Sequence, residues 1–429
     1  MKRATRFAAA LLALLLAHPV PAQTAATRPV AKPDRSKPPA LGPVRALKLP
    51  PVQKLRLSNG VPVLLMEQHE VPVVQLSVVA RAGAGVDPRD KPGLASLTAD
   101  MLDEGAGSRS ALQIADEIDY LGADLDTGAG WDLTSVGLHV PLKRFAAALP
   151  IFADVALKPT FPAAELERVR KDRLTELLQL RDEPRAIASI AFATALYGRD
   201  HRYGTAVMGT EKSVGALSRA DLELFHERTF TPVNSAIIVV GDVTAASIQR
   251  QLEEAFGSWK AAPGSAPEAV PAAPQVTSRG IWIVDKPGSA QSEIRIGRIG
   301  PPRSTRDYFA LTVMNTILGG SFTSRLMQNL REKHGYAYGA SSGFDFRLST
   351  GPFVAGAAVQ TDKTAPALTE FFQELEAIRK TVTEAEVAKA RNYVALSFPS
   401  EVETTGDIAS RLADQFVYDL PNDWLDSYV

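Results

Sequence analysis

One order of predicted secondary-structure elements occurs twice along the 429 residues, and this internal repeat constrains the fold more than any other feature. Residues 308–320 match residues 93–105, and an Ile-Ala-Ser triplet occurs at 187–189 and again at 408–410. Each triplet is followed at the same distance by a tyrosine. The individual matches are weak, but they share one order and a nearly constant offset. The sequence therefore predicts two homologous halves.

Each predicted half combines strand and helix patterns, which favours an α+β fold. Residues 55–67 predict a β-hairpin, because their central Asn-Gly tolerates the positive φ values of a tight turn. Residues 261–278 begin with a dense run of Ala, Pro and Gly, which is typical of a linker. We expect two halves, 49–260 and 279–429, joined clam-like by this linker. Each half is predicted to be a mostly antiparallel sheet covered by helices.

The first half has the more complete set of elements. Its predicted strands are 55–57, 61–67, 73–81, 124–129, 133–140 and 235–240. Its predicted helices are 93–102, 110–121, 142–156, 162–180, 185–196, 218–230 and 245–256. The second half stops at Val429 without a counterpart of residues 210–260, so we expect it to lack its carboxy-terminal segment.

The amino terminus has the pattern of a secretory signal peptide, predicted at residues 1–22. Lys2, Arg3 and Arg6 form a basic end, a short apolar core follows, and small residues precede the expected cleavage site. Residues 23–48 are rich in Pro, Ala and basic residues, which predicts a flexible spacer. This pattern predicts export to the periplasm. An uncleaved amphipathic anchor is the alternative.

The composition narrows the possible partners and chemistry. The chain has no cysteine, which excludes disulfides, thiol catalysis and a lipid anchor on cysteine. Its net charge of −1 argues against nucleic acid or an anionic membrane as an obligate partner. No apolar run reaches the length of a membrane span, so we expect none.

The stretch from Gly93 to Leu102 has apolar residues at helical spacing and follows an apolar strand pattern. Its surroundings resemble the active-site helix of the insulinase/pitrilysin family, which includes the mitochondrial processing peptidases. That family carries H-x-x-E-H here; two His and a distant Glu hold zinc, and the inner Glu is the general base. In this chain Ser96 and Asp100 stand at the His positions, and Ala99 stands at the Glu position.

The residues at these positions cannot perform the family's chemistry. A hydroxyl and one carboxylate do not replace two imidazoles on zinc, and Ala99 accepts no proton. Glu176 stands near the position of the distant Glu, where a solvated or salt-bridged helix residue is the plainer interpretation. Asp100 and Glu176 together could bind a hard cation weakly. We predict that this chain holds no zinc.

The most specific match to the family runs from Leu318 to Tyr338. The resemblance implies that Arg331 and Tyr338 bind the peptide carbonyl and the oxyanion that develops on it. The alternative is a surface ion pair between Arg331 and Glu332, with the Tyr in the core. Tyr336 is a rival for the role of the Tyr, although its spacing fits less well.

Gly319-Gly320-Ser321 looks like the glycine-rich loop with which the non-zinc subunit of the processing peptidases contacts substrate. Glycines allow a backbone to approach a bound peptide closely. The alternative is the carboxy-terminal cap of a helix, and both interpretations can hold together.

In relatives, an edge strand near residues 124–129 takes the substrate by β-addition. Asp126, Gly128 and Gly130 predict an irregular strand here, which weakens the case for peptide binding by this half.

The resemblance implies a catalytically incomplete subunit of a periplasmic heterodimeric zinc peptidase. A homologous partner would bind zinc through an intact H-x-x-E-H, and this chain would supply Arg331, Tyr338 and the glycine loop to act on peptides or unfolded proteins. The alternative is a non-catalytic peptide-binding or structural protein with the same fold. A self-sufficient hydrolase with a relocated site has no Ser–His or Cys–His arrangement to support it.

Overall fold

The computed structural model describes residues 36, 47–260, 269–273, 276–425 and 427–428. The predicted signal peptide and most of the predicted spacer lie outside these residues. Of the predicted linker, residues 269–273 and 276–278 are described, and none of them lies in a helix or strand. The described residues from 47 onwards belong to one compact unit. Within the described part of the chain, no helix combines the length and the apolar character needed to cross a membrane.

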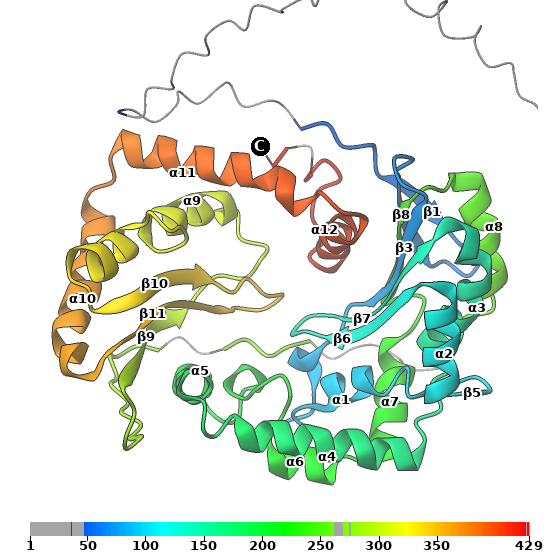
Figure 1. The fold of residues 1–429 in the computed structure, drawn as a ribbon, viewed down its shortest axis with the longest axis horizontal. Helices are drawn as coiled ribbons and strands as arrows, with labels where there is room; N and C mark the ends of the chain where they lie inside the picture. The colour runs from blue at the N-terminus through cyan, green and yellow to red at the C-terminus, as the bar shows by residue number, and fades with distance from the viewer. Residues whose placement is uncertain (1–35, 37–46, 261–268, 274–275, 426, 429) are drawn as a thin grey trace, which may run out of the picture. The chain divides into compact units, whose positions relative to one another are not determined.

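The first half contains a six-stranded sheet in the order β1-β2-β8-β3-β7-β6 (Figure 1). Every pair is antiparallel except β2 and β8, which confirms the predicted mostly antiparallel sheet. The hairpin of β1 and β2 also agrees with the sequence pattern. The strands are β1 Gln53–Arg56, β2 Pro62–Glu67, β3 Val73–Ala80, β6 Asp124–Ala129, β7 Thr134–Pro141 and β8 Ser235–Gly241.

The helices of the first half agree with the predicted positions, and several start at a residue that caps them. Ser110 and Ser218 each form a reciprocal capping box with the third residue of the following helix. The short helix α6 and the two-residue strands β4 Gly105–Ala106 and β5 Arg109–Ser110 were not predicted. The helices are α1 Leu94–Asp100, α2 Ala111–Leu121, α3 Leu142–Leu157, α4 Ala163–Gln179, α5 Pro184–Tyr197, α6 Glu211–Ala216, α7 Arg219–Thr229 and α8 Ala245–Phe256.

The second half repeats this order with a three-stranded antiparallel sheet, β10-β11-β9. The predicted counterparts of α1 and α5 are the helices α9 and α12. Residues Met327–Lys333 form a π-helix, η3. The remaining elements are β9 Gln291–Ile299, β10 Ala337–Phe344, β11 Pro352–Gln360, α9 Tyr308–Leu318, α10 Thr364–Lys380, α11 Glu384–Ser397 and α12 Thr405–Val417.

The first sheet has an apolar core on each face. Alternate residues of a strand point to opposite faces, so Leu65 joins the core formed with α3 and α8, whereas Leu64 points the other way. The second face is covered by α12 of the other half, whose Ile408 and Leu412 are fully buried. All seven residues of β8 are buried because the strand is covered on both sides (Figure 1).

The matched helices of the repeat are exchanged between the halves. While α12 packs on β8 and β3, its counterpart α5 packs on β9 of the second sheet. The tyrosines at the carboxy-terminal ends of the two helices also form hydrogen bonds with the opposite half. The Tyr418 hydroxyl donates to Asp132 Oδ2 at 3.1 Å, and the Tyr197 hydroxyl donates to the Thr350 carbonyl oxygen at 2.9 Å. Each half therefore completes the packing of the other.

We expect Leu412→Ala in α12 to lower the free energy of unfolding by about 2–5 kcal/mol, because it opens a cavity between the helix and the first sheet. Urea unfolding followed by tryptophan fluorescence and by circular dichroism measures this loss. Leu396→Ala in α11, at a half-exposed position, is the control and should change little. If the first half of Leu412→Ala unfolded at the wild-type midpoint, α12 would not stabilise the first sheet, and this prediction would be wrong.

Candidate functional site

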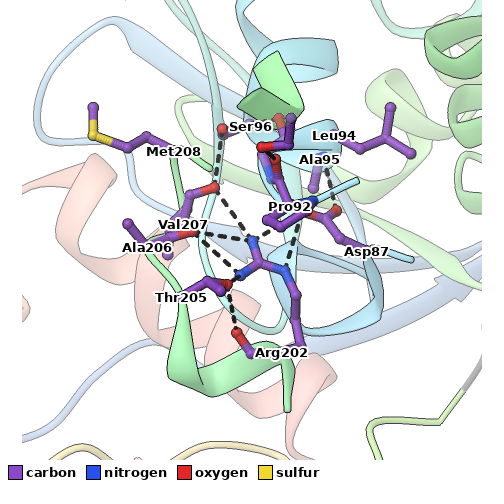
Figure 2. A network of polar contacts seen from close by, with 12 residues as sticks. Asp87, Pro92, Leu94, Ala95, Ser96, Arg202, Thr205, Ala206, Val207 and Met208 are labelled. Carbon is purple, nitrogen blue, oxygen red and sulfur yellow. Dashed lines mark hydrogen bonds and ion pairs between the residues drawn. The ribbon is translucent and has the colours of Figure 1, made fainter. Parts of the chain in front are cut away.

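Helix α1, which carries the degenerate motif, is held at its start by a carboxylate from outside the helix (Figure 2). Its N-cap residue is Gly93, with φ of 95°, which has no side chain to cap the helix. Asp87 replaces such a cap, accepting hydrogen bonds from the backbone amides of Gly93 at 2.8 Å and Ala95 at 2.9 Å. A negative charge at this end of a helix also interacts favourably with the helix dipole.

Arg202 completes this anchor from the segment η2, Arg202–Gly204. Its Nη2 lies 2.9 Å from Asp87 Oδ2, and the two side chains are 4% and 0% exposed. Arg202 also donates to Thr205 Oγ1 and to the Ala206 carbonyl oxygen (Figure 2). Burial raises the pKa of Asp87, and the Arg202 charge and the two amides oppose that increase. Sequence reasoning missed this pair because the two residues belong to no common motif.

The three degenerate ligand positions, Ser96, Asp100 and Glu176, lie around one arginine. Arg173 of α4 donates through Nη1 to Ser96 Oγ at 2.9 Å and through Nη2 to Asp100 Oδ2. Its Nε lies 3.7 Å from Glu176 Oε2, one turn along the same helix. The structure thus brings the predicted positions together, with a buried guanidinium between them. The sequence analysis did not single out Arg173.

This arrangement does not fit a zinc ion. Ser96 supplies a neutral hydroxyl that already accepts a hydrogen bond from Arg173, and Asp100 is paired with the same guanidinium. Ala99 is buried and has only a methyl group, so no proton acceptor stands at the general-base position. Among the described residues, no group of three His, Cys, Asp or Glu side chains is arranged for a metal ion.

Acidic residues follow one another at the carboxy-terminal end of α1, where the helix dipole disfavours negative charge. Asp103 is partly buried, and burial, followed by the charges of Glu104 and Asp100, raises its pKa to about 6. Burial also raises the pKa of Asp100, against the effect of Arg173. Arg168 of α4 pairs with Glu104. Arginines of α4 therefore balance part of this negative charge.

Arg331 and Tyr338 lie together on the surface of the second half. The Arg331 Cζ atom is 5.0 Å from the centre of the Tyr338 ring and 4.8 Å from that of Phe322, which is a cation–π arrangement with two rings. Tyr338 is 86% exposed and Phe322 is 61% exposed. We name Phe322, Arg331 and Tyr338 the aromatic–arginine cluster. Sequence reasoning missed Phe322, although it directly follows the glycine loop.

The alternatives for this pair are resolved in part. Arg331 does form the ion pair with Glu332, at 3.4 Å. Tyr338 is not a core residue, contrary to the alternative interpretation, because its ring is almost fully exposed. The rival Tyr336 packs against the core of the second half and stacks on His334. Tyr338 is therefore the more exposed of the two tyrosines, and its catalytic role stays a prediction.

The glycine loop ends α9. Gly319 is its C-cap residue, and the amides of Gly319 and Gly320 both donate to the Asn315 carbonyl oxygen. A Cβ atom on Gly319 would lie 2.3 Å from the Ser342 nitrogen of β10, so no larger residue fits. Ser321 Oγ donates to the Thr316 carbonyl oxygen. The helix-cap interpretation is therefore correct, and contact with substrate stays a prediction.

Strand β6 forms one edge of the first sheet. It pairs with β7 from Asp124 to Ala129 without a register shift, so the expected irregularity was wrong. The neighbouring strand explains this, because β7 is eight residues long, is largely buried and pairs with every residue of β6, including Gly128. Among the described strands, none pairs with the outer edge of β6.

Two family models cover most of the described chain. A model described as insulinase (peptidase family M16) matches residues 62–211, and one described as peptidase M16 inactive domain matches residues 216–394. An uncharacterized zinc protease of Mycobacterium tuberculosis is 29% identical over 339 residues, which are 76% of this chain and 76% of that protein. One of Bacillus subtilis is 25% identical over 362 residues, 84% of this chain and 87% of the relative.

Solved structures show the same fold. The crystal structure of a peptidase M16 inactive domain from Pseudomonas fluorescens superimposes with a TM-score of 0.82 and 29% identity. The match covers 88% of this chain and 90% of that one. A protease from Helicobacter pylori also reaches a TM-score of 0.82, at 22% identity, over 89% of this chain and 92% of its own.

We expect Asp87→Asn to lower the free energy of unfolding by about 3–5 kcal/mol, because it leaves the Arg202 charge buried without its partner. The exposed Asp90→Asn is the matched control and should change stability by less than about 0.5 kcal/mol. Urea unfolding at pH 7 measures both. Equal midpoints for the two variants would show that Asp87 does not anchor α1.

Asp103→Asn should alter the pH dependence of stability. The pKa of Asp103 rises from 3.8 to about 6 on folding, so the folded protein binds more protons than the unfolded chain between these values. The free energy of unfolding therefore falls as the pH rises through about 6. The Asn variant should lose this decrease and be more stable than the wild type at pH 7. Thermal unfolding from pH 4 to 7 tests this, with the exposed Asp116→Asn as control; a wild-type pH profile in Asp103→Asn would refute it.

Proposed function

The chain belongs to the insulinase family of peptidases, family M16, and we propose that it is a catalytically incomplete subunit of a periplasmic two-chain zinc peptidase. In this proposal a homologous partner holds zinc through an intact H-x-x-E-H. This chain supplies Arg331 and Tyr338 to the partner's site. The similarity of its residues 216–394 to the inactive M16 domain supports the incomplete character of the subunit.

One observation carries the proposal, namely the contrast between the two candidate sites. At the degenerate motif, the chain's own Arg173 donates hydrogen bonds to Ser96 Oγ and Asp100 Oδ2. At the aromatic–arginine cluster, the Tyr338 ring is 86% exposed, and among the described residues its hydroxyl has no hydrogen-bond partner. The polar groups at the degenerate motif are already paired within the chain, whereas a partly exposed Arg beside two exposed aromatic rings is typical of the centre of an interface.

The chemistry of Arg331 and Tyr338 suits the transition state of peptide hydrolysis. A guanidinium offers several donors in a fixed fork, and a tyrosine hydroxyl offers one neutral donor. Two such donors stabilise the oxyanion that forms when water attacks a peptide carbonyl. Arg331 lies in the π-helix η3, and short π-helical segments often occur at functional sites. The unpaired edge of β6 can bind an extended peptide by adding a strand to the sheet.

Hydrolysis of a quenched fluorescent peptide tests the proposal directly. It is measured for this chain alone, for a homologue with an intact H-x-x-E-H alone, and for their mixture. We expect activity in the mixture only, lost on addition of a chelator. Chelator-sensitive activity of this chain alone would contradict our interpretation of Ser96, Ala99 and Asp100.

Arg331→Ala should lower kcat of the mixture about a hundredfold, because it removes a donor that acts only in the transition state. Tyr338→Phe keeps the ring and removes the hydroxyl, so it should lower kcat more than it raises KM. The exposed Lys333→Ala, a cation two residues from Arg331, is the control and should leave kcat unchanged. Zinc content, measured by atomic absorption, should be the same in all mixtures. Wild-type turnover in Arg331→Ala would sink the assigned role.

A peptide-binding or structural protein remains the second candidate, and the free edge of β6 is the observation that favours it. If a folded, zinc-loaded homologue gives no activity in the mixture, binding of a labelled unfolded peptide to this chain alone becomes the decisive measurement. Binding without cleavage would establish the second candidate in place of the first.

A further inference from the structure

We propose that the guanidinium of Arg173 occupies the place that a metal ion takes at this motif, and that Arg173 itself prevents a divalent metal from binding there. The replaced residues Ser96 and Asp100 are then only part of the reason why the site holds no metal. This inference concerns the first half alone and does not depend on the proposed peptidase partner.

The positions that surround the guanidinium carry the inference. Its three nitrogens each face one degenerate ligand position: Nη1 faces Ser96 Oγ at 2.9 Å, Nη2 faces Asp100 Oδ2, and Nε faces Glu176 Oε2 at 3.7 Å. These are the positions at which the family places two His and one Glu on zinc. A cation that belongs to the chain therefore lies among the three positions whose side chains would otherwise converge on a metal.

A guanidinium excludes a metal in two ways. It is a cation that repels a divalent ion at short range, and the repulsion is strong where protein surrounds the charges. It also has no lone pair to offer as a ligand, and it keeps its charge throughout the pH range in which proteins are folded. Arg173 is buried, so it cannot turn out into solvent without losing its hydrogen bonds.

The guanidinium also makes the cross-link that a metal would make. It joins α1, through Ser96 and Asp100, to α4, on which Arg173 and Glu176 lie. Its Nη1 also donates to the Met208 carbonyl oxygen at 3.2 Å, which ties in the segment that precedes α6. Arg173 therefore holds α1, α4 and this segment together without any ligand from outside the chain.

Restoring the ligands with and without Arg173 tests the proposal. The variant Ser96→His/Asp100→His supplies both imidazoles and keeps Glu176, and a second variant adds Arg173→Ala to these changes. Zinc affinity is measured by competition with a chromogenic chelator. We expect the added Arg173→Ala to tighten zinc binding by at least about a hundredfold. Zinc should then raise the Tm of this variant and leave that of the double-His variant unchanged.

A matched control removes a different cation from the same helix. Lys171→Ala in the double-His background takes away an exposed positive charge of α4 and should not restore zinc binding. Equal zinc affinity with and without Arg173 would overturn the proposal. A folded Arg173→Ala variant that still binds no zinc would overturn it as well, since the guanidinium would not then occupy the metal's place.

Folding of each variant is checked by circular dichroism before zinc is added. If Arg173→Ala does not fold beside the two histidines, Arg173→Leu fills more of the buried space with a neutral side chain, and the same two outcomes apply to it.

Discussion

The first sheet has apolar side chains on both faces, and the rest of the structure depends on covering the second of them. Helices of the first half cover only one face, against which Leu65 and Leu76 pack. The other face, with Leu64, Met66 and Ile238, is buried by α12 from the far end of the chain. Leaving it in water would lose the hydrophobic stabilisation of several large side chains, each of about 1.5–3 kcal/mol. The matched helices of the repeat thus each bury the sheet of the other half: α12 packs on the first sheet, and α5 packs on the second.

Within this framework α1 is a helix held by charges at both ends. Asp87 and Arg202 fix its start, and Arg173 binds its last turn through Asp100. Side chains of the same chain therefore supply the charges that hold this helix in place. The aromatic–arginine cluster shows the opposite character, because the chain leaves Phe322 and Tyr338 largely uncovered. The polar groups at α1 are paired within the chain, whereas the two rings of the aromatic–arginine cluster are exposed.

Local patterns explain why much of the fold could be predicted. Capping boxes at Ser110 and Ser218 mark helix starts, and alternating apolar residues mark the strands of the first sheet. The predicted irregularity of residues 124–129 failed because pairing with β7 outweighs the low strand propensity of Gly128. Helix α6 escaped prediction because a six-residue helix has too few turns for a periodic pattern. The halves were found from their order of elements, but nothing local predicts that their helices are exchanged.

The amino-acid sequence by itself determined that this chain lacks the chemistry of a zinc peptidase at α1, because a methyl group at Ala99 and a hydroxyl at Ser96 are covalent facts that no fold can change. It also indicated the repeat, and the resemblance to the family pointed to Arg331 with a tyrosine, whose catalytic role stays a prediction. Only the tertiary structure decided that Arg173 lies among Ser96, Asp100 and Glu176, and that Tyr338 rather than Tyr336 is exposed. The physical reason is that charge pairing and burial depend on distances through space. Ser96 and Arg173 are 77 residues apart in the chain, yet the Ser96 Oγ and Arg173 Nη1 atoms are 2.9 Å apart in the structure.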